Sequence, residues 1–185
     1  KLVTEKIENT SGSINFSHDD QYIFYSKLDE NHRPRSIFRH QIGSSINEDL
    51  LIFEEKTKAF TVSIGISSDE KYYFINSSDH NTSEKYYFGA DEKKPEPKLI
   101  QQRKKGIIYS VNSWGENFYM HTNEDAEDFK ILISNNIESK VWETYIPSQS
   151  ETMIGNLTFL NNWQIRSVLK LSLIHISEPT RQSSI

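Results

Sequence analysis

Short segments in which polar and apolar residues alternate recur along the whole chain, and they are rich in aromatic and β-branched side chains. Such segments favour strands that are buried on one face. No segment sustains an apolar period of 3.6 residues over three turns, so the pattern predicts an all-β chain. The expected strands are residues 13–16, 22–26, 36–41 and 50–54, then 62–66, 72–76, 85–88 and 98–101, and then 107–111, 118–122, 129–134 and 141–146.

The strand pattern is repeated. Residues 14–26 (INFSHDDQYIFYS) align with residues 64–76 (IGISSDEKYYFIN) at an offset of 50, a third copy begins at Val111, and a weaker fourth begins at Thr158. The aromatic anchors of the four copies are Tyr22, Tyr72, Phe118 and Trp163, at spacings of 50, 46 and 45 residues. A four-stranded propeller blade repeats every roughly 40 to 50 residues, so the pattern predicts consecutive blades.

Residues 1–170 provide about three and a half four-stranded antiparallel blades, whereas propellers close with roughly four to eight. The fold predicted is therefore a partial β-propeller that leaves sheet edges for other blades to cover. An open sandwich of about 14 short strands is the alternative. A sandwich gives no reason for turns and aromatic anchors to recur in register, so we favour the propeller.

The two ends of the chain differ from the repeats. Residue 1 is lysine rather than methionine, so the start of the chain carries no information. Residues 171–181 read LSLIHISEPTR, which is the translation of a widely used transposase sequencing adapter. We therefore expect the propeller to occupy residues 1–170 and interpret residues 171–185 as an adapter-derived tail, which takes no part in the fold prediction.

Composition excludes several classes of protein. No apolar run approaches the roughly 20 residues of a membrane span, and no secretory leader opens the chain, so we expect no membrane partner. The chain has no cysteine, which excludes disulfides and thiolate chemistry and favours the cytoplasm. Lys and Arg number 21 against 26 Asp and Glu, giving a net charge of −5, the wrong sign for a surface that binds nucleic acid.

Catalytic motifs are absent from the sequence. A nucleophile elbow needs Gly-x-Ser-x-Gly, but the seven glycines include no pair four residues apart. There is no His-Glu-x-x-His, Walker or dinucleotide motif either, so we expect no cofactor and no catalytic residue within this chain.

Histidines are the remaining candidates for chemistry. His40 and His121 lie in predicted strands without an identifiable nucleophile, so we interpret them as packed or solvated strand residues. Three others lie in polar turns, each beside one carboxylate: His18, His32 and His80. A metal site needs three or more converging ligands, so we do not expect these turns to bind metal.

Several segments resemble a known family. These are DENHRP (29–34), FRH (38–40), FEE (53–55), TSE (82–84) and NEDAEDFK (123–130), and the similarity covers most of residues 8–170. Together they resemble the prolyl oligopeptidase family of serine peptidases, and within it the oligopeptidase B group. The resemblance implies a seven-bladed propeller over an α/β-hydrolase catalytic domain in cis, which cleaves short basic peptides after Lys or Arg. The propeller would restrict entry, and the catalytic Ser, Asp and His would lie downstream.

Charged loops are the strongest site candidates. Strand alternation places the loops 28–35, 77–83 and 123–128, and the connections 54–58 and 103–106, at one face of the propeller. The charged residues singled out there are Arg33, Arg35, Arg103, Lys104, Lys105, Glu124, Asp125, Glu127 and Asp128. This face is either a solvated rim or a domain-docking and gating surface held by exchangeable ion pairs. Two functions remain open: part of a serine oligopeptidase, or a non-catalytic propeller scaffold that binds other proteins.

Overall fold

The computed structural model describes residues 6–170, 173–176 and 180–181, with side chains described up to residue 170. Its regular structure consists of strands and one 3₁₀ turn, η1 (Ile46–Glu48). The chain divides into two compact units, each described by itself: unit 1 is Lys1–Ile66 with Glu70–Arg103, and unit 2 is Ser67–Asp69 with Lys104–Ile185.

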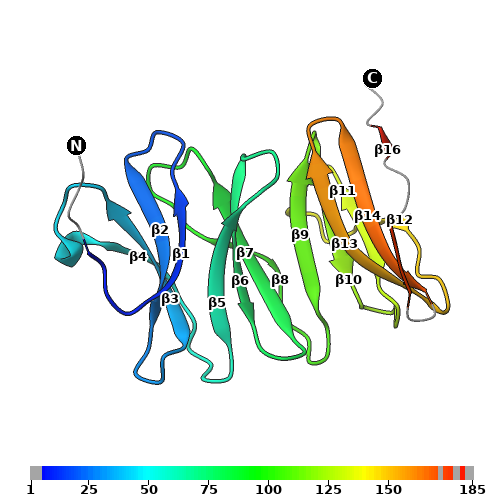
Figure 1. Cartoon of the computed structure of the whole chain (residues 1–185), viewed down its shortest axis with the longest axis horizontal. Coiled ribbons are helices and arrows are strands. Elements are labelled where there is room, and N and C mark those ends of the chain that lie inside the picture. Colours follow the sequence, from blue (N-terminus) through cyan, green and yellow to red (C-terminus); the bar gives the residue numbers. More distant parts are fainter. Residues whose placement is uncertain (1–5, 171–172, 177–179, 182–185) are drawn as a thin grey trace. The chain divides into compact units, whose positions relative to one another are not determined.

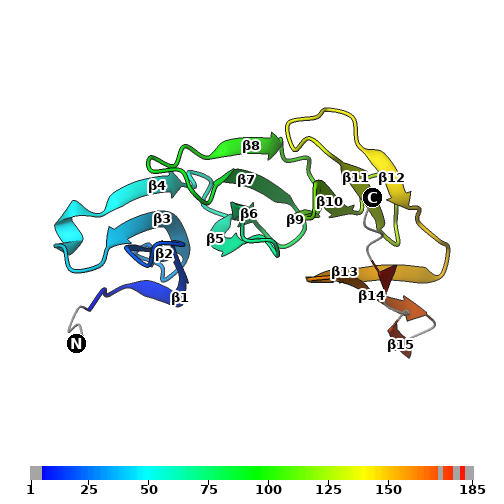
Figure 2. The ribbon, with the colours of Figure 1, turned by 90° about the horizontal axis from the view of Figure 1, so that it is seen from above.

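Unit 1 contains two four-stranded antiparallel sheets whose strands are neighbours in sequence order, β1-β2-β3-β4 and β5-β6-β7-β8 (Figures 1 and 2). The first sheet comprises β1 (Thr10–Phe16), β2 (Tyr22–Leu28), β3 (Pro34–Gln41) and β4 (Leu50–Glu54). The second comprises β5 (Thr61–Ile66), β6 (Tyr72–Ser78), β7 (Ser83–Gly89) and β8 (Lys98–Gln101). Each sheet is thus a simple meander, as expected for a propeller blade.

Short polar residues make the first turn of each meander. In the β1–β2 turn, Ser17 Oγ donates to Asp19 Oδ1 over 2.6 Å, and the Gln21 amide donates to the same oxygen over 3.1 Å. Asp20 then adopts a positive φ of 54°. Glu70, at the equivalent place before β6, has a φ of 59°. The turns therefore lie where the sequence repeat predicts them.

The core of unit 1 lies between its two sheets. Phe24 on β2, Tyr73 on β6 and Phe88 on β7 bring their rings together, with centroids 4.6 to 5.6 Å apart. These residues and the others of the cluster are buried: Ile37, Ile52, Val62 and Ile75. Hydrogen bonds also join β1 to the second sheet, from Asn15 Nδ2 to the Ile64 carbonyl on β5 over 3.0 Å and from the Tyr73 hydroxyl on β6 to the Phe16 carbonyl.

Unit 2 repeats the arrangement. One sheet has the order β12-β11-β10-β9, and the other has β13-β14-β15 with β16 also paired to β14. The strands are β9 (Tyr109–Trp114), β10 (Asn117–Thr122), β11 (Lys130–Ser134), β12 (Glu143–Ile146), β13 (Thr152–Leu160), β14 (Trp163–Lys170), β15 (Leu173–Ile176) and β16 (Thr180–Arg181). The core of unit 2 is formed by Trp114, Tyr119, Ile131, Ile154 and Phe159.

The prediction of an all-β partial propeller is confirmed. β1, β3 and β7 begin two or three residues earlier than predicted, and β9 and β12 begin two residues later. β9 begins at Tyr109 rather than Ile107, because the Ile107 amide closes a turn on the Lys104 carbonyl. β12 begins at Glu143 rather than Val141, because the backbone of Val141 is bonded to the Ser139 hydroxyl.

The fourth sheet includes part of the segment interpreted as an adapter-derived tail. The backbone of β15 pairs with β14 from Ser167 to Lys170, and that of β16 pairs with Trp163 and Gln164. Residues 171–172, 177–179 and 182–185 lie outside the described residues, and the origin of the tail stays a prediction. Within the described ranges, no helix is long and apolar enough to cross a membrane.

Candidate functional site

A charged cavity of about 750 Å³ lies at one end of unit 1, between the β2–β3 loop and the connection from β4 to β5. We call residues 55–60 the blade connection, because they link the two sheets of unit 1. The residues that line the charged cavity are Asp29, Glu30, Asn31, Arg33, Arg35, Glu54, Glu55, Lys56 and Lys58.

Asp29 orders the β2–β3 loop. Its Oδ1 accepts hydrogen bonds from the backbone amides of Asn31 (2.8 Å) and Arg33 (3.0 Å), and its Oδ2 pairs with Arg35. The amide of Arg33 and these other donors together hold the pKa of the Asp29 carboxyl below its ordinary value. The loop therefore enters β3 in a fixed geometry, with Arg33 directly before Pro34.

Arg35 binds the blade connection from the side of the first sheet. Its Nη1 donates to the carbonyls of Thr57 (2.7 Å) and Phe60 (3.0 Å), and its Nη2 donates to that of Lys58 (3.1 Å). Nε and Nη2 also donate to Asp29 Oδ2. All five N–H groups of the guanidinium thus have acceptors, so Arg35 is a structural clamp and has no donor left for a ligand.

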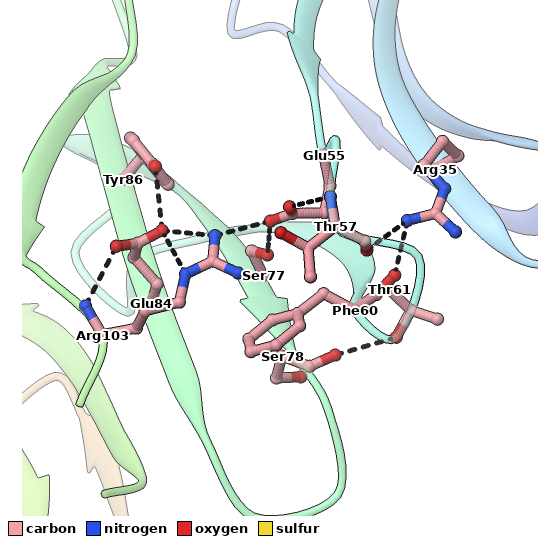
Figure 3. A network of polar contacts seen from close by, with 10 residues as sticks. All are labelled: Arg35, Glu55, Thr57, Phe60, Thr61, Ser77, Ser78, Glu84, Tyr86 and Arg103. Carbon is pink, nitrogen blue, oxygen red and sulfur yellow. Dashed lines mark hydrogen bonds and ion pairs between the residues drawn. The ribbon is translucent and has the colours of Figure 1, made fainter. Parts of the chain in front are cut away.

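Arg103 binds the same connection from the side of the second sheet (Figure 3). Its Nη2 lies 2.7 Å from Glu55 Oε2 and 2.6 Å from Glu84 Oε2, and its Nε donates to Glu84 over 2.9 Å. The guanidinium carbon also lies 4.1 Å from the ring centroid of Phe60. One arginine therefore holds two carboxylates, one on the blade connection and one on β7.

Both glutamates are buried, with only 4% of Glu55 and 5% of Glu84 exposed. Burial favours a raised pKa for Glu55, but hydrogen bonds from Ser77, Arg103 and Thr57 outweigh it and lower the pKa to about 2. Burial disfavours the charged form of Arg103, yet its hydrogen bonds to Glu84 and Glu55 raise its pKa. Glu55 and Arg103 therefore stay ionised at neutral pH.

Acid should destabilise unit 1 through Glu55. Its folded pKa of about 2 lies below its ordinary value of 4.5, so its contribution is complete above pH 4.5 and is lost as the pH falls toward 2. Between pH 6 and pH 3, we expect the unfolding free energy of the native chain to fall by about 2 kcal/mol more than that of Glu55→Gln. Urea unfolding of both proteins at the two pH values measures this difference, and equal losses would contradict the assignment.

The structure separates the predicted site residues into two groups. Arg33, Arg35 and Arg103 belong to unit 1, where Arg33 and Arg35 line the charged cavity. The other predicted residues belong to unit 2, where Lys104 pairs with Glu124. Glu124 lies with Asp125, Glu127 and Asp128 on the β10–β11 loop, and Lys105 is exposed on the segment that follows Lys104.

Sequence reasoning did not identify Glu55 and Glu84 as the partners of Arg103. They lie 48 and 19 residues away from it in the chain. Their positions, just after β4 and near the start of β7, follow from the strand repeat. Which carboxylates are buried depends on the packing between the sheets, which the repeat does not show.

Two histidines are held by specific contacts. His40 Nδ1 lies 2.6 Å from Asp49 Oδ1, both side chains are buried, and the Tyr25 hydroxyl donates to Asp49 Oδ2 over 2.8 Å. His121 stacks on Phe129 and its Nε2 lies 2.8 Å from the Ile154 carbonyl. In the part of the chain that the structure describes, no group of three or more His, Asp or Glu side chains could hold a metal ion.

Comparison with known proteins agrees with the fold. Residues 1–173 match the family described as prolyl oligopeptidase, N-terminal β-propeller domain. Protease 2 of Moraxella lacunata is 36% identical over 145 residues, which cover 76% of this chain and 21% of that protein. Dipeptidyl aminopeptidase BI of Pseudoxanthomonas mexicana is 21% identical over 169 residues, which cover 89% of this chain and 23% of that protein.

Solved structures show the same fold. Oligopeptidase B from Trypanosoma brucei, with covalently bound antipain, superposes with a TM-score of 0.89 at 24% identity, over 95% of this chain and 25% of that chain. Oligopeptidase B from Leishmania major gives a TM-score of 0.89 at 22% identity with the same coverage. The chain spans about a fifth of the length of the curated relatives it matches.

Proposed function

Because this chain belongs to the family of prolyl oligopeptidase N-terminal β-propeller domains, we propose that it forms part of the substrate-gating propeller of a serine oligopeptidase. The parent enzyme would hydrolyse short peptides after Lys or Arg, with the catalytic Ser, Asp and His in an α/β-hydrolase domain in cis. The observation that carries the proposal is the run of sequential four-stranded meanders, which matches oligopeptidase B structures over 95% of the chain.

In this proposal the chain helps to select substrates and takes no part in the hydrolysis itself. Peptide hydrolysis needs an activated nucleophile and an oxyanion hole, and the sequence lacks the Gly-x-Ser-x-Gly motif that would supply them in this fold family. The propeller would restrict entry to short, unfolded peptides. The charged cavity would be part of the surface where the propeller docks on the peptidase domain, with Arg35 and Arg103 holding that surface in shape.

Activity of the parent protein tests this function. We expect the intact protein to hydrolyse a short chromogenic peptide ending in arginine, to reject the matched peptide ending in glutamate, and to be inhibited by a serine-specific reagent. The purified 185-residue chain should show no turnover. An intact parent protein that folds but hydrolyses neither peptide would contradict the proposal and favour a non-catalytic scaffold.

A further inference from the structure

The charged side chains around the charged cavity fall into two groups, those with an ion-pair partner and those without one. Asp29 and Arg35 neutralise each other, and Glu55 is paired with Arg103. Arg33 uses one donor, to the Lys58 carbonyl over 3.1 Å. Among the described residues, Lys56 and Lys58 have no carboxylate partner, and neither Glu30 nor Glu54 has a cationic one. Three cations and two carboxylates of the cavity thus lack an ion-pair partner, while its lining as a whole carries four charges of each sign.

The unpaired cations are held on a fixed backbone. Lys56 and Lys58 lie on the blade connection, whose carbonyls at Thr57, Lys58 and Phe60 accept hydrogen bonds from Arg35. Its start is fixed because Glu55 Oε1 accepts the Thr57 amide over 2.7 Å. Charges that are ordered before binding lose less conformational entropy when a partner arrives, so this geometry is better suited to binding than that of a loose surface loop.

We propose that the charged cavity is a receptor for one or two carboxylate side chains of the peptidase domain of the same protein, bound by Arg33, Lys56 and Lys58. This inference rests on the proposed function. The free face of the Arg33 guanidinium can bind a carboxylate through two parallel N–H donors, and the lysines add point charges beside it. Glu30 and Glu54 would repel a uniformly acidic tract, so the fitting partner presents isolated carboxylates.

A peptide titration of the full 185-residue chain tests the chemistry. We expect acetyl-Glu-Gly-Glu-Gly-amide to cause saturable NMR shifts confined to residues 29–35 and 54–60, while the matched glutamine and lysine peptides cause none. Arg33→Gln, and the double variant Lys56→Gln with Lys58→Gln, should each weaken binding about fivefold, as expected for exposed ion pairs. The matched control, Lys94→Gln, changes an exposed lysine that does not line the cavity and should leave binding unchanged.

Zero-length carbodiimide cross-linking of the intact parent protein tests the partner. Lys56 or Lys58 should be joined to an Asp or Glu of the peptidase domain, and Lys94 should not. Equal binding of the three peptides, or cross-links from Lys56 and Lys58 only within the propeller, would overturn the inference. Neither readout needs catalysis, so an inactive parent protein with an intact cross-link would contradict the proposed function and leave the receptor standing.

Discussion

Replacing Arg103 with methionine should destabilise unit 1 by about 3–5 kcal/mol, the usual cost of removing one partner from a buried ion pair. The reason is that Glu55 and Glu84, both nearly inaccessible to solvent, would lose their shared cation. The contact between the guanidinium and the Phe60 ring would be lost as well. Amide hydrogen exchange of β2 and β6 measures the effect on unit 1 directly, because the three tryptophans, Trp114, Trp142 and Trp163, all lie in unit 2.

The neighbouring lysine provides a matched control for this variant. Lys104→Met removes a cation whose side chain is 59% exposed and belongs to unit 2, so it should leave exchange in unit 1 unchanged. Adding Glu55→Gln and Glu84→Gln to Arg103→Met should restore more than half of the lost stability, because the unpaired carboxylates cause most of the cost. No recovery in the triple variant would show instead that packing on Phe60 dominates.

Replacing Phe88 with alanine should cost about 3–5 kcal/mol, the range for deleting a buried phenylalanine ring. Phe88 is 1% exposed and contacts the rings of Phe24 and Tyr73, so the substitution leaves a cavity where the two sheets of unit 1 meet. The surrounding strands are hydrogen-bonded on both sides and have little freedom to close that space. The same hydrogen-exchange measurement reports the loss.

Two further variants calibrate the effect of Phe88→Ala. Phe16→Ala makes the same change at a side chain that is 51% exposed, and we expect a shift within about 0.5 kcal/mol. Phe88→Leu keeps most of the volume and should cost less than about 1.5 kcal/mol. If Phe88→Ala and Phe16→Ala had equal effects, the ring cluster would not be the centre of the core.

Strand order could be predicted from the sequence because each turn and each aromatic anchor has a local cause. Tyr22 and Tyr72 begin β2 and β6, and Trp163 begins β14, just as the repeat predicts. Two strands, β9 and β12, begin two residues later than predicted, because a local hydrogen bond competes with strand pairing there. Val141 has the side chain of a strand residue but is 79% exposed, because the Ser139 hydroxyl bonds its backbone on both sides.

The sequence predicts a charged face but not the charged cavity itself. Arg33, Arg35 and the blade connection could be assigned to one face because strand alternation fixes the end at which each loop emerges. Whether the side-chain donors of each arginine are hydrogen-bonded or free could not be predicted from the sequence. Arg33 and Arg35 are two residues apart, yet Arg35 uses all its donors while Arg33 uses one, a difference set by contacts with carbonyls more than 20 residues away.

The core cluster of unit 1 also bears on how the chain folds. Every pairing within the two sheets of unit 1 joins consecutive strands, so each of these meanders has low contact order and can form quickly. The buried residues, however, come from both sheets: Phe24, Ile37 and Ile52 from one, and Val62, Tyr73, Ile75 and Phe88 from the other. A single meander therefore has nothing to cover its apolar face, and the smallest cooperative folding unit is a pair of adjacent repeats rather than one.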